Sequence, residues 1–129
     1  MLSNPSRFLA PLIALGLLAV APPLHAQAAN NGALLSRGKT LWNNRGCAGC
    51  HAFGRKLAGP DMAGVEKRRT RAWLTEFLKD TEQMLATDST AKALLKQFGG
   101  VKMPNAKLAG PDIDAILAYI QSEGSKQKK

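Results

Sequence analysis

The length of this chain, 129 residues, suits one small domain and excludes a larger assembly of domains. Lysine and arginine outnumber aspartate and glutamate by 18 to 9, so the net charge is +9 at pH 7 and the isoelectric point is near 10.0. The two cysteines lie three positions apart, and a bridge between them would close almost no loop, which excludes a disulfide-stabilised scaffold.

The first 28 residues are similar to a cleavable secretory leader. One arginine precedes residues 8–21, which are apolar and uncharged. A spanning helix needs about 20 apolar residues, and this run is shorter and contains Pro11, so a cleaved leader is favoured over a membrane anchor. The small residues Ala26 and Ala28 predict cleavage after Ala28 or after Ala26. We therefore expect an exported, periplasmic protein without stable membrane insertion, and export argues against nucleic acid as its partner.

Four segments of the remaining chain show the periodicity of amphipathic helices, and no alternating strand pattern is present. The helices are expected over about residues 32–44, 70–79, 88–98 and 111–123. Residues 52–69 form a loop containing glycine and proline, which has few ways to fold unaided. The predicted fold is a small all-α domain over residues 29–124, with long loops around a buried disc-shaped group, followed by a solvated basic tail over residues 125–129.

Capping residues mark the expected helix ends. Thr70 suits the N-cap of the second helix, and either Asp88 or Ser89 could cap the third. Pro111 suits the first position of the fourth helix, because its missing N–H is not needed there. Gly124 is expected to end that helix.

The sequence Cys47-Ala48-Gly49-Cys50-His51 follows the first predicted helix and is typical of covalent haem attachment. Two thiols on one turn can each add to one of two neighbouring vinyl groups, and His51 then lies below the ring and can bind iron. A structural zinc site needs four ligands, but after leader removal the chain has no cysteine or histidine besides these three. A thioredoxin-like pair would need strands, which the sequence lacks. The motif therefore predicts haem c with His51 as an iron ligand.

The second axial ligand is expected to be a methionine, because the mature chain has no second histidine. Met103 is the preferred candidate, since it follows two glycines and precedes Pro104 in an irregular loop that could cross the other haem face. Met84, between the second and third helices, is one alternative, and an open coordination site is another. Met62 follows His51 closely and is expected to remain on the histidine side, as core filler.

From about residue 34 to residue 124 the chain resembles the class I monohaem c-type cytochromes of the soluble, periplasmic bacterial type. The resemblance rests on four features in order: Cys47-x-x-Cys50-His51, Gly59-Pro60, Met103-Pro104 and a final helix with Tyr119-Ile120. It implies a small helical fold around one covalent haem, in which Gly38 and Trp42 lie where the first helix crosses the last, near Tyr119.

The resemblance also implies roles for individual residues. Pro60 matches a proline whose carbonyl accepts the Nδ1 hydrogen of the proximal histidine, although it could be only a turn residue. Trp73 matches a tryptophan whose indole N–H faces a haem propionate, and a purely apolar core role is equally compatible. Asn105 could hydrogen-bond the methionine sulfur or a neighbouring backbone group. Three arginines could pair with propionates or form a solvated face: Arg68, Arg69 and Arg71.

The function implied by the resemblance is that of a single-electron carrier, not an enzyme. His51 and Met103 would fill both axial positions of iron that alternates between ferrous and ferric. We expect a monomer, and the basic charge predicts that it docks with acidic surfaces on redox partners. Two alternatives stay open: a haem subunit of a larger oxidoreductase complex, and a five-coordinate haem protein with peroxidase or gas-binding activity. Residues 81–100 form a fuller helical insert than the smallest family members carry and could provide a partner-specific surface.

Overall fold

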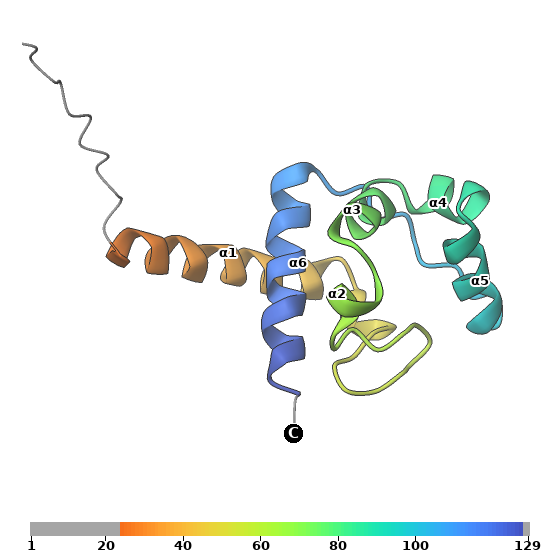
Figure 1. Cartoon of the computed structure of the whole chain (residues 1–129), viewed down its shortest axis with the longest axis horizontal. Coiled ribbons are helices and arrows are strands. Elements are labelled where there is room, and N and C mark those ends of the chain that lie inside the picture. The colour runs from red at the N-terminus through yellow and green to blue at the C-terminus, as the bar shows by residue number, and fades with distance from the viewer. Residues whose placement is uncertain (1–23, 128–129) are drawn as a thin grey trace, which may run out of the picture.

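The computed structural model describes residues 24–127, so most of the predicted leader and the end of the basic tail lie outside the described residues. It consists of helices, and residues 24–127 contain no strand, which confirms the predicted all-α fold. The elements in chain order are α1 (Leu24–Asn44), the 3-10 turn η1 (Cys47–Gly49), α2 (Val65–Arg68), α3 (Arg71–Lys79), α4 (Thr81–Thr87), α5 (Ser89–Gln97) and α6 (Gly110–Ser125) (Figure 1). None of the helices in this part of the chain is long and apolar enough to cross a bilayer.

Helix α1 begins earlier than its periodicity predicted. It starts at Leu24 rather than near residue 32, and it runs without a break through Ala26 and Ala28, where cleavage was predicted. Residues 30–33 are exposed, so the apolar spacing used for the prediction starts only where the helix meets the rest of the fold. Leader cleavage stays a prediction.

The expected caps are confirmed for α3 and α5. The Thr70 hydroxyl accepts the backbone N–H of Trp73 at 3.2 Å, and the Asp88 carboxylate, not Ser89, caps α5 by accepting the N–H of Ala91 at 2.8 Å. Helix α6 begins at Gly110, one residue earlier than predicted, so Pro111 is the second residue of its first turn and not the first.

The predicted stop at Gly124 is wrong by one residue, since α6 continues to Ser125. A Cβ at Gly124 would lie 3.1 Å from the Cα of Ala63 and 3.2 Å from the backbone nitrogen of Gly64. This glycine therefore permits close packing of α6 on the loop before α2 rather than ending the helix.

Two short helices were not expected from the sequence. Helix α2 has four residues and α4 has seven, which is too short for an apolar periodicity to be distinguished. Asp80 separates α3 from α4 and caps α4 by accepting the N–H of Gln83 at 3.0 Å. The insert over residues 81–100 is therefore a pair of helices, α4 and α5, that lies beyond α3 in Figure 1.

Helices α1 and α6 cross with their backbones almost in contact. A Cβ at Gly38 would lie 2.1 Å from the carbonyl oxygen of Ala115 and 2.6 Å from the Cβ of Tyr119, so the crossing requires glycine, as predicted. The rings of Trp42 and Tyr119 lie beside it with centroids 6.1 Å apart. Arg37 and Asp112 form an ion pair across the same two helices, with 2.5 Å between nitrogen and oxygen.

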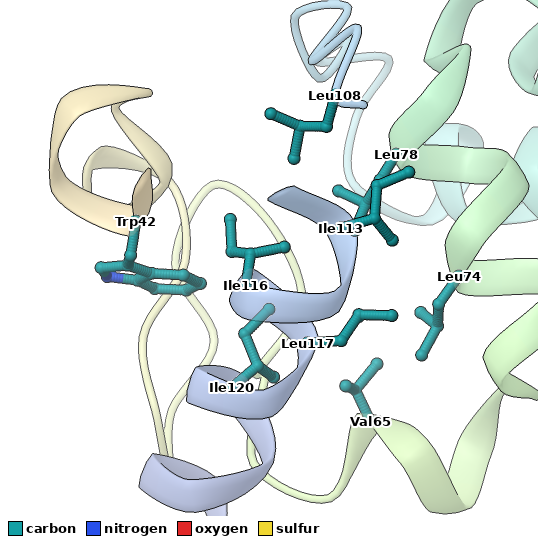
Figure 2. Packing of buried hydrophobic residues seen from close by; sticks show 9 residues of the cluster. All are labelled: Trp42, Val65, Leu74, Leu78, Leu108, Ile113, Ile116, Leu117 and Ile120. Carbon is teal, nitrogen blue, oxygen red and sulfur yellow. The ribbon is translucent and has the colours of Figure 1, made fainter. Parts of the chain in front are cut away.

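The core lies on both sides of α6. The apolar residues of α6 expected from its spacing are all buried: Ile113, Ile116, Leu117 and Ile120. Figure 2 shows Trp42 of α1 on one side of this helix and Val65, Leu74 and Leu78 on the other, with Leu108 near its start. Helix α6 is therefore the element on which α1, α2 and α3 pack.

Candidate haem site

A cavity of about 490 Å³ lies between α3, α5, α6 and the segments that follow α1 and α5. Its volume is within the usual range for a small-molecule or cofactor site. All the residues predicted to bind the cofactor line this one cavity: Cys47, Cys50, His51, Pro60, Trp73 and Met103. The fold thus brings together side chains that are up to 56 positions apart in the chain, from Cys47 to Met103.

The cysteine motif forms one tight turn at the wall of the cavity. Gly46 has a φ of 73° and starts the turn, and the Cys47 carbonyl accepts the N–H groups of Cys50 at 3.2 Å and His51 at 2.9 Å. Both thiols are free and half-buried. Burial raises the pKa of the Cys47 thiol, and a backbone hydrogen bond and the charge of Arg45 offset part of that rise. Two free thiols that line the same cavity suit thioether bonds to a haem.

The imidazole of His51 is held by the following loop. Its Nδ1 lies 3.0 Å from the carbonyl oxygen of Pro60, which confirms the contact expected from the resemblance. A carbonyl can only accept, so Nδ1 carries the hydrogen and Nε2 keeps its lone pair for a metal. The Gly59 N–H donates to the Cys50 carbonyl at 2.8 Å and closes this loop on the motif.

Gly59 has a part in the site that the sequence did not reveal by itself. A Cβ at this position would lie 2.5 Å from Cε1 and 2.8 Å from Nδ1 of His51, so only glycine leaves room for the ring. The sequence pair Gly59-Pro60 is part of the resemblance, but the resemblance implied a role beside the histidine for Pro60 only.

The three methionines beyond the leader are placed differently. Met103 lies in the irregular segment after α5, lines the cavity and packs against the core. Met62 also lines the cavity, on the segment that follows Pro60, where its N–H donates to the Ala52 carbonyl at 2.9 Å. Met84 lies on α4 and does not line the cavity. The geometry therefore favours Met103 over Met84 as a ligand from outside the histidine loop.

Trp73 lines the cavity, but its N–H is already used. The indole Nε1 donates to Asp88 Oδ1 at 3.1 Å, which corrects the expectation that this N–H faces a propionate. The ring stacks on Phe77 with centroids 4.9 Å apart, and the Arg69 guanidinium lies 5.6 Å from its centroid. The N–H groups of Ala91 and of the indole lower the pKa of the Asp88 carboxyl. Trp73 is therefore an apolar wall fixed to the start of α5.

The arginines expected near propionates divide into two groups. Arg71 does not line the cavity and pairs with Asp114 of α6 at 2.6 Å. Arg68 and Arg69 do line it, and the buried Nε of Arg69 has no hydrogen-bond partner within residues 24–127. A buried donor without an acceptor is rare in a complete structure, so this one fits an anionic group in the cavity.

The charge of the whole lining agrees with that fit. The cations that line the cavity are Arg45, Arg68, Arg69 and Lys102, and none of the described lining residues is an aspartate or glutamate. The rest of the lining is mostly apolar and includes Leu94 and Leu95 of α5 and Phe98, which follows that helix. An apolar cavity with two thiols, one oriented imidazole and unopposed cations fits haem c, whose ring is apolar and whose propionates are anions. Over residues 24–127 no group of three or more histidine, cysteine or acidic side chains could hold a bare metal ion.

Comparisons with known proteins identify a family and a fold for this chain. A family model for cytochrome c matches residues 35–123. The structure is similar to a cytochrome c from Rhodothermus marinus, with 24% identity and a TM-score of 0.67, over 87% of this chain and 91% of that one. It is also similar to the cytochrome c domain of a Pseudomonas putida protein, with 32% identity and a TM-score of 0.60, over 69% of this chain and 89% of that one. No curated protein sequence gives a significant match.

Proposed function

The chain belongs to the cytochrome c family, which carries electrons on covalently bound haem c, and from that premise we propose that His51 and Met103 are its two axial iron ligands. The observation that carries the proposal is the orientation of His51. Its Nδ1 is fixed on the Pro60 carbonyl at 3.0 Å, beside both free thiols, in the cavity that Met103 also lines.

The protein supplies a rigid imidazole to the iron. The Pro60 carbonyl keeps the hydrogen on Nδ1 and makes Nε2 a better donor, and the absence of a side chain at Gly59 leaves the ring in place. When bound, haem c supplies a single reversible electron, and a fixed ligand lets iron change its charge without rearrangement of the protein.

The methionine side is proposed to close the second coordination position. A thioether stabilises ferrous iron and raises the reduction potential relative to a second imidazole. With both positions filled, no site is left for oxygen or peroxide, so the chain acts as a carrier and not as an enzyme. Arg69 supports the same function, because a cation beside the propionates neutralises a buried anionic charge.

The proposed setting is the periplasm, with acidic redox proteins as partners. The leader predicted over residues 1–28 supports export, and the net charge of +9 supports encounter with negative surfaces. Arg45 and Lys102 are exposed and line the cavity, so a partner that docks over the cavity would meet cationic side chains. Electron transfer to an acidic partner should therefore slow as the salt concentration rises. The same features suit a haem subunit of an oxidoreductase, and the native size of the purified material distinguishes that alternative from a free shuttle.

Visible spectroscopy of the ferric holoprotein tests the ligand set. We expect a sulfur-to-iron charge-transfer band that is lost in Met103→Ala and kept in Met84→Ala, since Met84 does not line the cavity. Met62→Leu, which changes the other methionine of the lining, should keep it as well. Survival of the band in Met103→Ala would contradict the proposed ligand. A high-spin spectrum with rapid carbon monoxide binding by the reduced wild-type protein would instead favour a five-coordinate haem protein.

A further inference from the structure

The segment between α5 and α6 carries Met103 but has little structure of its own. In the described chain, residues 102–107 form no backbone–backbone hydrogen bond. The nearest such bonds are at its two ends, where the Val101 N–H donates to the Phe98 carbonyl at 3.3 Å and the Leu108 N–H donates to the Leu78 carbonyl at 3.2 Å. Something other than backbone pairing therefore keeps this segment in place.

Asn105, two positions after Met103, makes the missing contacts. Its side-chain oxygen accepts the backbone N–H of Thr81 at 3.1 Å, and its side-chain nitrogen donates to Asp80 Oδ1 at 3.2 Å. Figure 1 shows the segment returning past the junction of α3 and α4, where these two residues lie. The sulfur contact expected as one option for Asn105 is not made in this structure, and the backbone option is.

The junction is a firm anchor. Thr81 is fully buried, and its hydroxyl donates to the Phe77 carbonyl at 2.8 Å. Asp80 Oδ1 also accepts the Gln83 N–H as the cap of α4. The Thr81 N–H needs an acceptor, and the Asp80 carboxylate needs a donor. The amide of Asn105 supplies both from one side chain. An aspartate at 105 would place two carboxylates together, and an alanine would leave the Thr81 N–H without its acceptor.

We propose that Asn105 is a positioning residue that holds Met103 against the iron by tying its segment to the α3–α4 junction. The proposal rests on the proposed His51 and Met103 ligation. Movement of the segment away from the cavity would carry the sulfur with it and would break both hydrogen bonds of Asn105. Helix α4, which is part of the insert, therefore serves the axial ligand, because its first N–H and its capping carboxylate are the two groups that Asn105 binds.

Imidazole binding to the ferric holoprotein tests this, because imidazole competes with the methionine for iron. Asn105→Ala should keep the charge-transfer band but bind imidazole about tenfold more tightly, since two hydrogen bonds no longer hold the segment. Asn105→Asp keeps an acceptor for Thr81 but loses the donor to Asp80, so it should also bind more tightly, and it covers the case in which Asn105→Ala does not fold. In a double-mutant cycle, Asp80→Ala should increase the affinity for imidazole less in the Asn105→Ala background than in the wild type.

Two matched controls separate positioning from general stability. Asn43→Ala changes an exposed asparagine of α1, and Thr70→Ala removes the cap hydrogen bond of α3 and lowers the free energy of unfolding. Both should bind imidazole as the wild type does. The proposal is wrong if the imidazole dissociation constant of both Asn105 variants stays within about twofold of the wild-type value. If Met103→Ala instead keeps the band and the wild-type imidazole affinity, the ligand assignment has failed rather than the role of Asn105.

Discussion

Gly38 of α1 lies directly against the backbone of Ala115 of α6, and a methyl group at position 38 would stand 2.1 Å from the Ala115 carbonyl oxygen. That distance is far below van der Waals contact, and the atom in the way belongs to a helix backbone that cannot turn aside. Because α6 also carries one wall of the core and of the cavity, the spacing of this crossing sets the geometry of the site.

The crossing leads to a prediction on stability. Gly38→Ala should lower the free energy of unfolding by about 1–3 kcal/mol or more, because the two helices must separate. Gly32→Ala is the matched control, since it lies on the same helix with no atom within 4 Å of the added methyl group. It should be neutral or stabilising by up to about 1 kcal/mol, as helix propensity requires. Denaturant unfolding of both holoproteins measures the difference. Equal changes in unfolding free energy for the two variants would contradict the close contact between Gly38 and α6.

A second prediction concerns the space around the proximal histidine. Gly59→Ala should displace the His51 ring, because the added methyl group would lie 2.5 Å from Cε1. We expect less holoprotein per cell and a perturbed ferric spectrum, with a loss of about 1–3 kcal/mol in unfolding free energy. Gly49→Ala lies within the cysteine motif, where a methyl group meets no atom within 4 Å, and should behave as the wild type. A wild-type spectrum for Gly59→Ala would contradict this prediction, since it would mean that the loop moves to accommodate the methyl group.

The third prediction uses acid as the probe of Asp88. Its pKa is lowered in the folded protein by the N–H groups of Ala91 and Trp73, so its ionised form stabilises the fold. This contribution is fully present above the unfolded pKa of about 3.9 and is lost as the pH falls through the lower folded pKa. Asp88→Asn keeps an oxygen acceptor but removes the charge, so its unfolding free energy should fall less steeply below pH 4 than that of the wild type.

Asp88→Ala provides the comparison, because it removes both hydrogen bonds at every pH. At pH 7 it should be the least stable of the three proteins, with faster hydrogen exchange at the start of α5. If the unfolding free energies of the wild type and Asp88→Asn change in parallel with pH, the charge of Asp88 does not stabilise the fold.

The fourth prediction concerns charge beside the cofactor. Arg69→Gln removes a cation that lines the cavity, so ferrous iron should lose stability and the reduction potential should fall by tens of millivolts, where about 59 mV is a tenfold change for one electron. Arg71→Gln removes the same charge two positions away, where the side chain pairs with Asp114 outside the cavity, and should leave the potential nearly unchanged. Potentiometric titration compares the two, and equal shifts would mean that net charge alone is responsible.

Much of this protein could be predicted from the sequence, because the relevant signals are local. The cysteine motif is five consecutive residues, so its chemistry needed no fold to be visible. The caps at Thr70 and Pro111 and the apolar spacing of α6 depend on residues within one or two turns of each other, and they placed three helices within a residue or two. Helices α2 and α4 were not predicted, because helices of four and seven residues are too short to show an apolar periodicity.

Only the tertiary structure decided the contacts between distant segments. The sequence left Met84 open beside Met103, and only the tertiary structure separates them, because α4 contributes Leu85 and not Met84 to the lining of the cavity. The indole N–H of Trp73 meets Asp88 fifteen positions later, and Asn105 meets Thr81 across twenty-four, because helix packing rather than local spacing brings these groups within hydrogen-bond reach. The five-residue motif that predicts haem attachment is thus identifiable from its order alone. The residues that hold His51 and Met103 in place depend on which backbone each segment is packed against.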